Sequence, residues 1–154
     1  MALQNPEKKQ SAAADGSRTM KNYIFKIDLK VRDYECDMQG IVNNAIYQNY
    51  LEHGRHEFLL SKGIDFNSLT QKQVFLVVVR AELDYKTPLR GGDTFWIGLN
   101  LERISPIRFV FLQDIYRYPD NRLVLAARTT GTALNPKGRP CLPPELAILL
   151  QPTC

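Results

Sequence analysis

The residues best suited to chemistry lie in one short stretch, where the acid Asp37 precedes Gly40 and the polar pair Asn43 and Asn44. Glycine allows a tight turn, and asparagine caps helix starts. A helix start has unpaired backbone N–H groups and the positive end of the helix dipole, so it can hold a developing negative charge. The stretch therefore predicts a reactive acid at Asp37. The alternative, which the same pattern allows, is that Asp37 only caps its own turn.

Other reactive side chains fit chemistry less well. His53 and His56 are three residues apart with acids beside them, which raises the hypothesis of a metal site. The pattern is not HExxH and no third ligand cluster is visible, so no metal is expected. Cys36 adjoins the candidate acid, but a thiol nucleophile needs a base, and the sequence places neither histidine beside it. A packing role is therefore favoured for Cys36.

Three cationic residues leave two interpretations each. Arg55 follows Asp37 by eighteen positions and either orients the acid or substrate, or forms a surface ion pair with Glu52 worth about 0.3–0.5 kcal/mol. Lys137 and Arg139 flank a glycine in a predicted turn. They either meet the phosphates of a carrier or belong to a solvated basic turn.

The elements that must position these residues follow from periodicity. Alternation over 23–31 predicts a half-buried strand. A helix over 44–61 is predicted with one packed side, formed by Tyr47, Tyr50, Leu51, Gly54 and Phe58. Four strands follow, over 73–85, 95–101, 108–118 and 123–134, and a short helix starts at Pro144. In the first of these strands, the apolar face is predicted to be Val77, Val79, Ala81, Leu83 and Tyr85.

This order predicts an α+β domain in which a curved antiparallel five-stranded sheet wraps around the long helix. The length of 154 residues with 44% apolar content suits one core. Residues 1–20 contain almost no large apolar side chains and are predicted to be a flexible tail. A single domain is expected over 21–154.

Charge and cysteine content restrict the partners. Lysine and arginine number 20 against 16 acids, which gives a net charge of +4 and suits an anionic partner. No basic run or RNA-binding signature accompanies the charge, so coenzyme A or an acidic acyl carrier protein fits better than nucleic acid. Three scattered cysteines argue against a disulfide framework, and no apolar run is long enough for a membrane span. We expect a protein that is soluble and not secreted.

The chain resembles the hotdog-fold thioesterases of the 4-hydroxybenzoyl-CoA thioesterase type through the motif Asp37-x-x-Gly40-x-Val42-Asn43-Asn44-x-x-Tyr47. It is most similar to the plant acyl-lipid thioesterases, including the methylketone-pathway enzymes, and to bacterial relatives. These share the runs Val31-Arg-Asp-Tyr-Glu and His53-Gly-Arg-His-Glu-Phe. The resemblance extends from about residue 23 to residue 150 and implies a hotdog fold.

The resemblance also implies a set of roles. Asp37 is expected to attack the thioester carbonyl or to activate a water, and both routes stay open. The oxyanion donor falls on the backbone amide of Asn44, with Arg55 as a further catalytic candidate. The predicted substrate-binding residues are Gly40, Val42, Asn43, Tyr47, Lys137 and Arg139. A site between two subunits is implied, hence a homodimer or homotetramer, and no cofactor is expected.

The type of acyl group is inferred from positions at which the sequence differs from that of the hydroxybenzoyl enzymes. Met38-Gln39 stands where those enzymes have Pro-Ala, and Asn43-Asn44 stands where they have aromatic or histidine residues. This favours a fatty-acyl or 3-oxoacyl thioester of acyl carrier protein or coenzyme A. Hydrolysis of 1,4-dihydroxy-2-naphthoyl-CoA or another aromatic acyl-CoA stays open, as does non-catalytic acyl-carrier binding. A hotdog dehydratase ranks lowest. The expected location is the cytoplasm, or the plastid stroma if the source is a plant.

Overall fold

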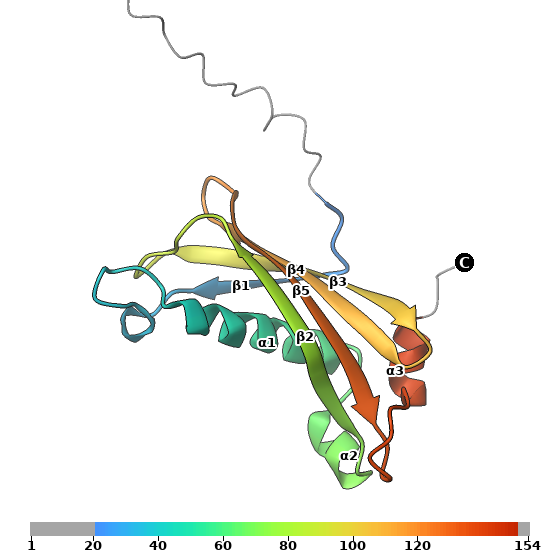
Figure 1. The fold of residues 1–154 in the computed structure, drawn as a ribbon. Coiled ribbons are helices and arrows are strands. Elements are labelled where there is room, and N and C mark those ends of the chain that lie inside the picture. Colours follow the sequence, from blue (N-terminus) through green and yellow to red (C-terminus); the bar gives the residue numbers. More distant parts are fainter. Residues whose placement is uncertain (1–20, 151–154) are drawn as a thin grey trace, which may run out of the picture.

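A computed structural model describes residues 21–150, which form a long helix beneath a curved sheet (Figure 1). In chain order the elements are β1 (Phe25–Lys30), the 3-10 turn η2 (Asp33–Glu35), α1 (Asn44–Ser61), α2 (Phe66–Gln71), β2 (Phe75–Tyr85), β3 (Thr94–Ser105), β4 (Arg108–Arg117), β5 (Arg122–Leu134) and α3 (Pro144–Leu149). The tail predicted over 1–20 lies outside the described residues. None of the helices within 21–150 is long and apolar enough to cross a membrane.

The five strands form one antiparallel sheet in the order β1-β3-β4-β5-β2. The hairpins β3-β4-β5 build its centre, while β1 and β2 lie at its two edges. The sheet curves, and α1 lies against its concave side (Figure 1). The predicted α+β fold, with a five-stranded sheet wrapped around one long helix, is therefore confirmed.

The packed side of α1 matches the prediction from its periodicity. The side chains of Tyr47, Tyr50, Leu51 and Phe58 are at most 3% exposed. They divide between two apolar clusters: the first turns of α1 pack with Ile97 and Leu125, among others, and its last turns pack against the far half of the sheet. Burial of this apolar face holds the helix in the sheet, since it contributes about 25 cal/mol per Å² removed from water.

Gly54 marks a close approach between α1 and β4. A Cβ atom built at this position would lie 3.1 Å from Nε2 of Gln113. The Gln113 side chain is fully buried and donates a hydrogen bond to the carbonyl of Leu51 at 2.9 Å. The glycine thus makes room for a buried amide, at a cost of about 1 kcal/mol in helix propensity relative to alanine.

Two local features differ from the sequence-based expectation. The short helix α2 was not predicted, because six residues are too few for a helical period to appear. In β2, the register shifts between Val78 and Arg80, so that Val79 is an extra, bulged residue. Strict alternation through Val77 and Val79 is therefore wrong: Val78, opposite Gly131 of β5, shares the helix-facing side with Ala81.

Candidate active site

Asp37 lies in a tight hairpin turn closed by the bridge pair Cys36 and Val42. The backbone N–H of Asp37 donates to the carbonyl of Ile41 at 2.8 Å, and the N–H of Gly40 donates to the carbonyl of Asp37 at 3.0 Å. Gly40 has a φ of +78°, in the left-handed region that glycine adopts without a Cβ clash. The turn expected from the acid and the glycine is therefore present.

The Asp37 carboxylate is exposed and only partly engaged. Its Oδ1 atom accepts hydrogen bonds from the backbone N–H groups of Gln39 at 2.8 Å and Ile41 at 3.4 Å. Within residues 21–150, Oδ2 makes no hydrogen bond or ion pair. One oxygen thus holds the turn, and the other is free to meet a substrate or a water.

The start of α1 follows within a few residues. Asn43 is the N-cap, and its Oδ1 accepts from the N–H of Ala45 at 3.0 Å. The N–H of Asn44, the first residue of this 18-residue helix, has no hydrogen-bond partner in the described part of the chain. Because this N–H lies at the positive end of the helix dipole, it suits an oxyanion.

Glu35, a buried acid close to the turn, was not predicted from the sequence. Glu35 is 7% exposed, and its Oε1 accepts from the Tyr50 hydroxyl at 2.9 Å and from the N–H of Arg32 at 2.8 Å. The carbonyl of Glu35 accepts from the N–H of Asn43. Glu35 therefore ties the segment before Asp37 to the cap and the second turn of α1. Its position beside a predicted strand offered no signal of this burial.

Two predicted substrate-binding residues, Val42 and Tyr47, are buried at 2% and 3% exposure. The N–H of Val42 donates to the carbonyl of Leu89, and the N–H of Leu89 donates to the Tyr47 hydroxyl at 3.1 Å. Burial raises the pKa of Tyr47. In one copy the backbone of Val42 and the hydroxyl of Tyr47 anchor the loop before β3 against the helix start, and substrate contact by either residue stays a prediction. Gly40 and Asn43, in contrast, are exposed.

Arg55 lies eleven residues along α1 from Asn44, at a different part of the molecule from Asp37. Its Nη1 donates to Oε1 of Gln113 at 3.1 Å. The surface ion pair with Glu52 is not formed; Glu52 lies 3.5 Å from Nε2 of His56 instead. Eleven residues of helix correspond to about 16 Å, so the arrangement does not bring Arg55 to the acid.

Lys137 and Arg139 occupy the turn after β5, where the side-chain oxygen of Asn135 accepts from both of their backbone N–H groups at 3.0 Å. The last residue of β5 pairs with the first residue of β2. The helix start lies near the other end of β2, about 33 Å away at 3.3 Å per residue. Within a single copy, Lys137 and Arg139 thus lie far from Asp37, and their contact with a carrier stays a prediction.

The remaining reactive side chains stay apart. Across residues 21–150, no cluster of three or more histidine, cysteine or acidic side chains could hold a metal ion. The His56 ring packs against the Phe66 ring at a tilt of 49° with centroids 4.5 Å apart, and His53 is exposed. Cys36 is half-buried and lies 4.0 Å from the carbonyl of Arg32. These contacts fit the packing role expected for Cys36.

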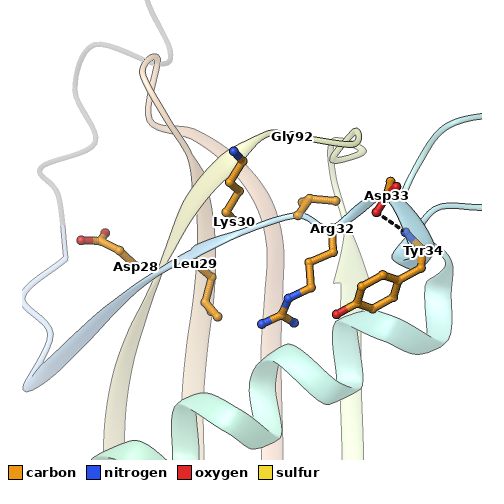
Figure 2. Close-up of a pocket in the computed structure, with 8 residues that line it drawn as sticks. Asp28, Leu29, Lys30, Arg32, Asp33, Tyr34 and Gly92 are labelled. Atoms are coloured by element: carbon orange, nitrogen blue, oxygen red, sulfur yellow. Dashed lines mark hydrogen bonds between the residues drawn. The ribbon is translucent and has the colours of Figure 1, made fainter.

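A wide surface hollow of about 660 Å³ runs along β1 and η2, lined by residues 28–34 and Gly92 (Figure 2). Leu29 and Lys30 point to opposite sides of the strand, and the N–H of Tyr34 donates to Oδ1 of Asp33 at 3.1 Å (Figure 2). Neither Asp37 nor Asn44 lines the hollow. It is therefore separate from the candidate catalytic residues.

Comparison with known proteins gives a family match over most of the chain. The family model described as the Thioesterase-like superfamily matches residues 31–149. A chloroplastic acyl-acyl carrier protein thioesterase of Arabidopsis thaliana is 40% identical over 79% of this chain and 65% of its own length. The long-chain acyl-CoA thioesterase FadM of Escherichia coli is 28% identical over 77% of this chain and 89% of its own length.

A solved structure supports the fold. The crystal structure of a hypothetical protein from Aquifex aeolicus superposes with a TM-score of 0.76 and 32% identity, and the match covers 82% of this chain and 99% of that one. The chain spans just under two thirds, 65%, of the Arabidopsis relative.

Proposed function

The chain belongs to the Thioesterase-like superfamily, and we propose that it hydrolyses an acyl thioester of coenzyme A or acyl carrier protein to a free acid and a thiol. The observation that carries this proposal is an exposed carboxylate a few residues before a helix start. Within residues 21–150, one oxygen of that carboxylate and the first N–H of the helix have no hydrogen-bond partner. Thioester hydrolysis needs a group that attacks the carbonyl carbon or activates a water to do so, and a donor that stabilises the negative carbonyl oxygen. The carboxylate of Asp37 fills the first role, and the backbone N–H of Asn44 fills the second.

Two routes use these groups. In the first, an oxygen of Asp37 adds to the carbonyl carbon, and the C–S bond breaks to release a thiolate that takes a proton from water. A second water then hydrolyses the resulting mixed anhydride, which frees the acid and restores the Asp37 carboxylate. In the second, Asp37 takes a proton from a water whose oxygen adds to the carbon, and the departing sulfur leaves as a thiol after gaining a proton. In both routes the carbonyl oxygen becomes negative, and the N–H of Asn44 stabilises that charge.

The carrier and the acyl group follow from charge and from the relatives. The net charge of +4 suits the phosphates of coenzyme A or an acidic carrier protein. The relatives named above act on acyl-acyl carrier protein and on long-chain acyl-CoA by their names. We therefore infer a fatty-acyl or 3-oxoacyl group. The plastid stroma is the expected location if the source is a plant, and the cytoplasm otherwise.

A homodimer is supported by the edge strand β2. This strand is 11 residues long and exposes large apolar side chains, namely Phe75, Val78, Val79 and Tyr85. A long apolar edge is a template for pairing with another strand, and soluble proteins rarely leave one uncovered. Antiparallel pairing of β2 with β2 of a second copy would satisfy two-fold symmetry and extend the sheet. Pairing of two such dimers would give a tetramer.

The catalytic proposal is tested by thiol release from a panel of acyl-CoA and acyl carrier protein thioesters. Asp37→Asn removes the carboxylate charge and should lower kcat by about 10²-fold or more, since acid–base catalysis typically contributes 10²–10⁴-fold. The matched control is Asp33→Asn, an exposed acid whose Oδ1 also holds a local turn. Equal rates for wild type and Asp37→Asn would eliminate the assignment. Saturable binding of acyl carrier protein without thiol release would favour a non-catalytic binding protein.

The dimer is tested by light scattering after size-exclusion chromatography. Val79→Lys places a charge on the exposed edge and should yield monomers. Ile148→Lys, at a side chain 66% exposed on α3, is the control for adding a charge elsewhere. A wild-type protein that is monomeric, or a Val79→Lys protein with unchanged mass, would contradict pairing along β2.

A further inference from the structure

A cavity of about 90 Å³ lies between the second half of α1 and the strands β2, β4 and β5. Most of its wall is apolar, including Leu59, Leu76, Phe109 and Phe111. Four polar side chains also line it: Glu52, Arg55 and His56 from α1, and Thr129 from β5. Glu52 and His56 lie close to each other, with Oε1 of Glu52 3.5 Å from Nε2 of His56. A purely apolar pocket would suit an alkyl chain alone, so the remaining two, Arg55 and Thr129, need an explanation.

The Arg55 guanidinium has no acidic partner within hydrogen-bonding distance in the described part of the chain. Its hydrogen bond goes to the neutral amide of Gln113, and Oε1 of the neighbouring Glu52 lies 3.5 Å from Nε2 of His56 instead. Burial lowers the pKa of Arg55 because desolvation disfavours the charged guanidinium, and the charge of Glu52 raises that pKa to a smaller extent. Arginine carries five N–H donors and no acceptor, so most of its hydrogen-bonding capacity remains available.

On the sheet side of the cavity, Thr129 has a buried hydroxyl that lacks a hydrogen-bond partner in the described part of the chain. The side chain is 2% exposed, and its hydroxyl oxygen is the buried side-chain atom without a hydrogen-bond partner within residues 21–150. Thr129 pairs with Phe111 in the sheet, on the helix-facing side. A buried hydroxyl without a partner is costly, so a ligand oxygen that satisfies it would gain affinity.

The cavity and the candidate catalytic amide of Asn44 lie along the same side of α1, beside β2. The Tyr85 hydroxyl of β2 donates to the carbonyl of Asn44 at 3.4 Å, and Val78 of β2 lines the cavity beside Arg55. Strand and helix therefore run together from one place to the other. Residues eleven apart in a helix lie on the same side, because eleven steps of 100° amount to about three full turns.

The distance along α1 between Asn44 and Arg55 sets the length of an acyl chain that could reach from the helix start to the cavity. Eleven residues of α-helix rise about 16 Å. An extended alkyl chain advances about 1.25 Å per carbon, given bonds of about 1.5 Å at near-tetrahedral angles, so about thirteen carbons span the interval. Helical side chains lean towards the N-terminus, which shortens the requirement towards about ten carbons.

We infer that this cavity is a specificity site that binds an oxygen-bearing far end of the acyl chain, with Arg55 and Thr129 as its hydrogen-bonding groups. The inference rests on the proposed thioesterase function and adds a substrate class to it: chains of about ten to thirteen carbons that end in a hydroxyl or a carboxylate. The carboxylate should bind most tightly, because it pairs with the Arg55 charge.

The experiment compares three coenzyme A thioesters whose acyl groups have the same number of carbons: dodecanoyl, ω-hydroxydodecanoyl and ω-carboxyundecanoyl. Wild type should show kcat/KM about tenfold higher for the carboxylate than for the plain chain, as expected for a charge-assisted hydrogen bond. Thr129→Val removes the hydroxyl at nearly constant volume and should reduce the preference for both oxygenated chains about fivefold. Thr130→Val is the matched control, since the next residue of β5 points to the other face of the sheet.

A binding measurement separates this inference from the proposed function. Free dodecanedioate and dodecanoate are titrated into the same three proteins by calorimetry. If no thioester is hydrolysed but the dianion binds more tightly and Thr129→Val removes the difference, the site stands and the hydrolase proposal fails. If hydrolysis proceeds equally for all three chains and Thr129→Val matches Thr130→Val, the site is overturned and the hydrolase proposal stands.

Discussion

Replacing Tyr50 with phenylalanine tests how the turn that carries Asp37 is held. The change removes one hydroxyl, which donates to Oε1 of Glu35 at 2.9 Å, and leaves the ring in place. Tyr50 is 3% exposed and Glu35 is 7% exposed, so no water readily replaces the lost donor. Burial and the hydrogen bond to Glu35 raise the pKa of Tyr50, so its hydroxyl remains a donor throughout the neutral range.

The expected loss is about 2 kcal/mol of unfolding free energy, since a hydrogen bond to a charged group contributes about 1.5–3 kcal/mol. The ring contact with Phe95, at 4.8 Å between centroids, should persist and add no packing cost. For a chain of this size the loss corresponds to a fall in Tm on the order of 6–8 °C. We also expect slower thiol release, because Glu35 ties the turn to the helix.

Urea unfolding of Tyr50→Phe and Tyr118→Phe tests whether burial or the length of the hydrogen bond determines the loss of unfolding free energy. Tyr118 donates to Oδ1 of Asp28 at 2.7 Å, a shorter hydrogen bond to the same kind of group, but both residues are exposed. Removing that bond should cost less than about 1 kcal/mol. An equal or larger loss for Tyr118→Phe would refute the reasoning that burial sets the energy.

Three further changes probe other local features. Gly40→Ala should cost about 1 kcal/mol in urea unfolding, because alanine is strained at a φ of +78°; an unchanged midpoint would show that the turn relaxes. Burial lowers the pKa of His56, so the unfolded chain binds that proton more tightly. The contribution of His56 to the unfolding free energy is therefore fully present above the unfolded-state pKa of about 6.5, and it is lost as the pH falls below that pKa. His56→Gln should flatten the decline measured between about pH 7.5 and 5.5, with the same substitution at exposed His53 as control. Thr129→Val should raise the unfolding free energy by about 1 kcal/mol in the absence of ligand, because it removes an unpartnered buried hydroxyl. A loss of stability would instead mean that a bound water satisfies that hydroxyl.

Local sequence signals were sufficient where the structure depends on neighbours in the chain. The bounds of α1 agree with the prediction, because its cap, Asn43, and its apolar period act within a few residues. The turn at Gly40 has the same local cause. Alternation failed at Val79, since a bulge arises from pairing with β5 and not from the residues of β2 themselves.

Long-range packing decided the rest. Nothing near Glu35 in the sequence indicates that Tyr50, fifteen residues later, buries its carboxylate. The contact between Arg55 and Gln113 joins residues 58 positions apart and depends on the register of β4 beneath α1. By itself, the sequence determined the α+β order, the long helix and the acid before it. Only the tertiary structure decided that Arg55 points into a cavity with an unpartnered Thr129, because burial and hydrogen-bond partners exist only once distant segments pack.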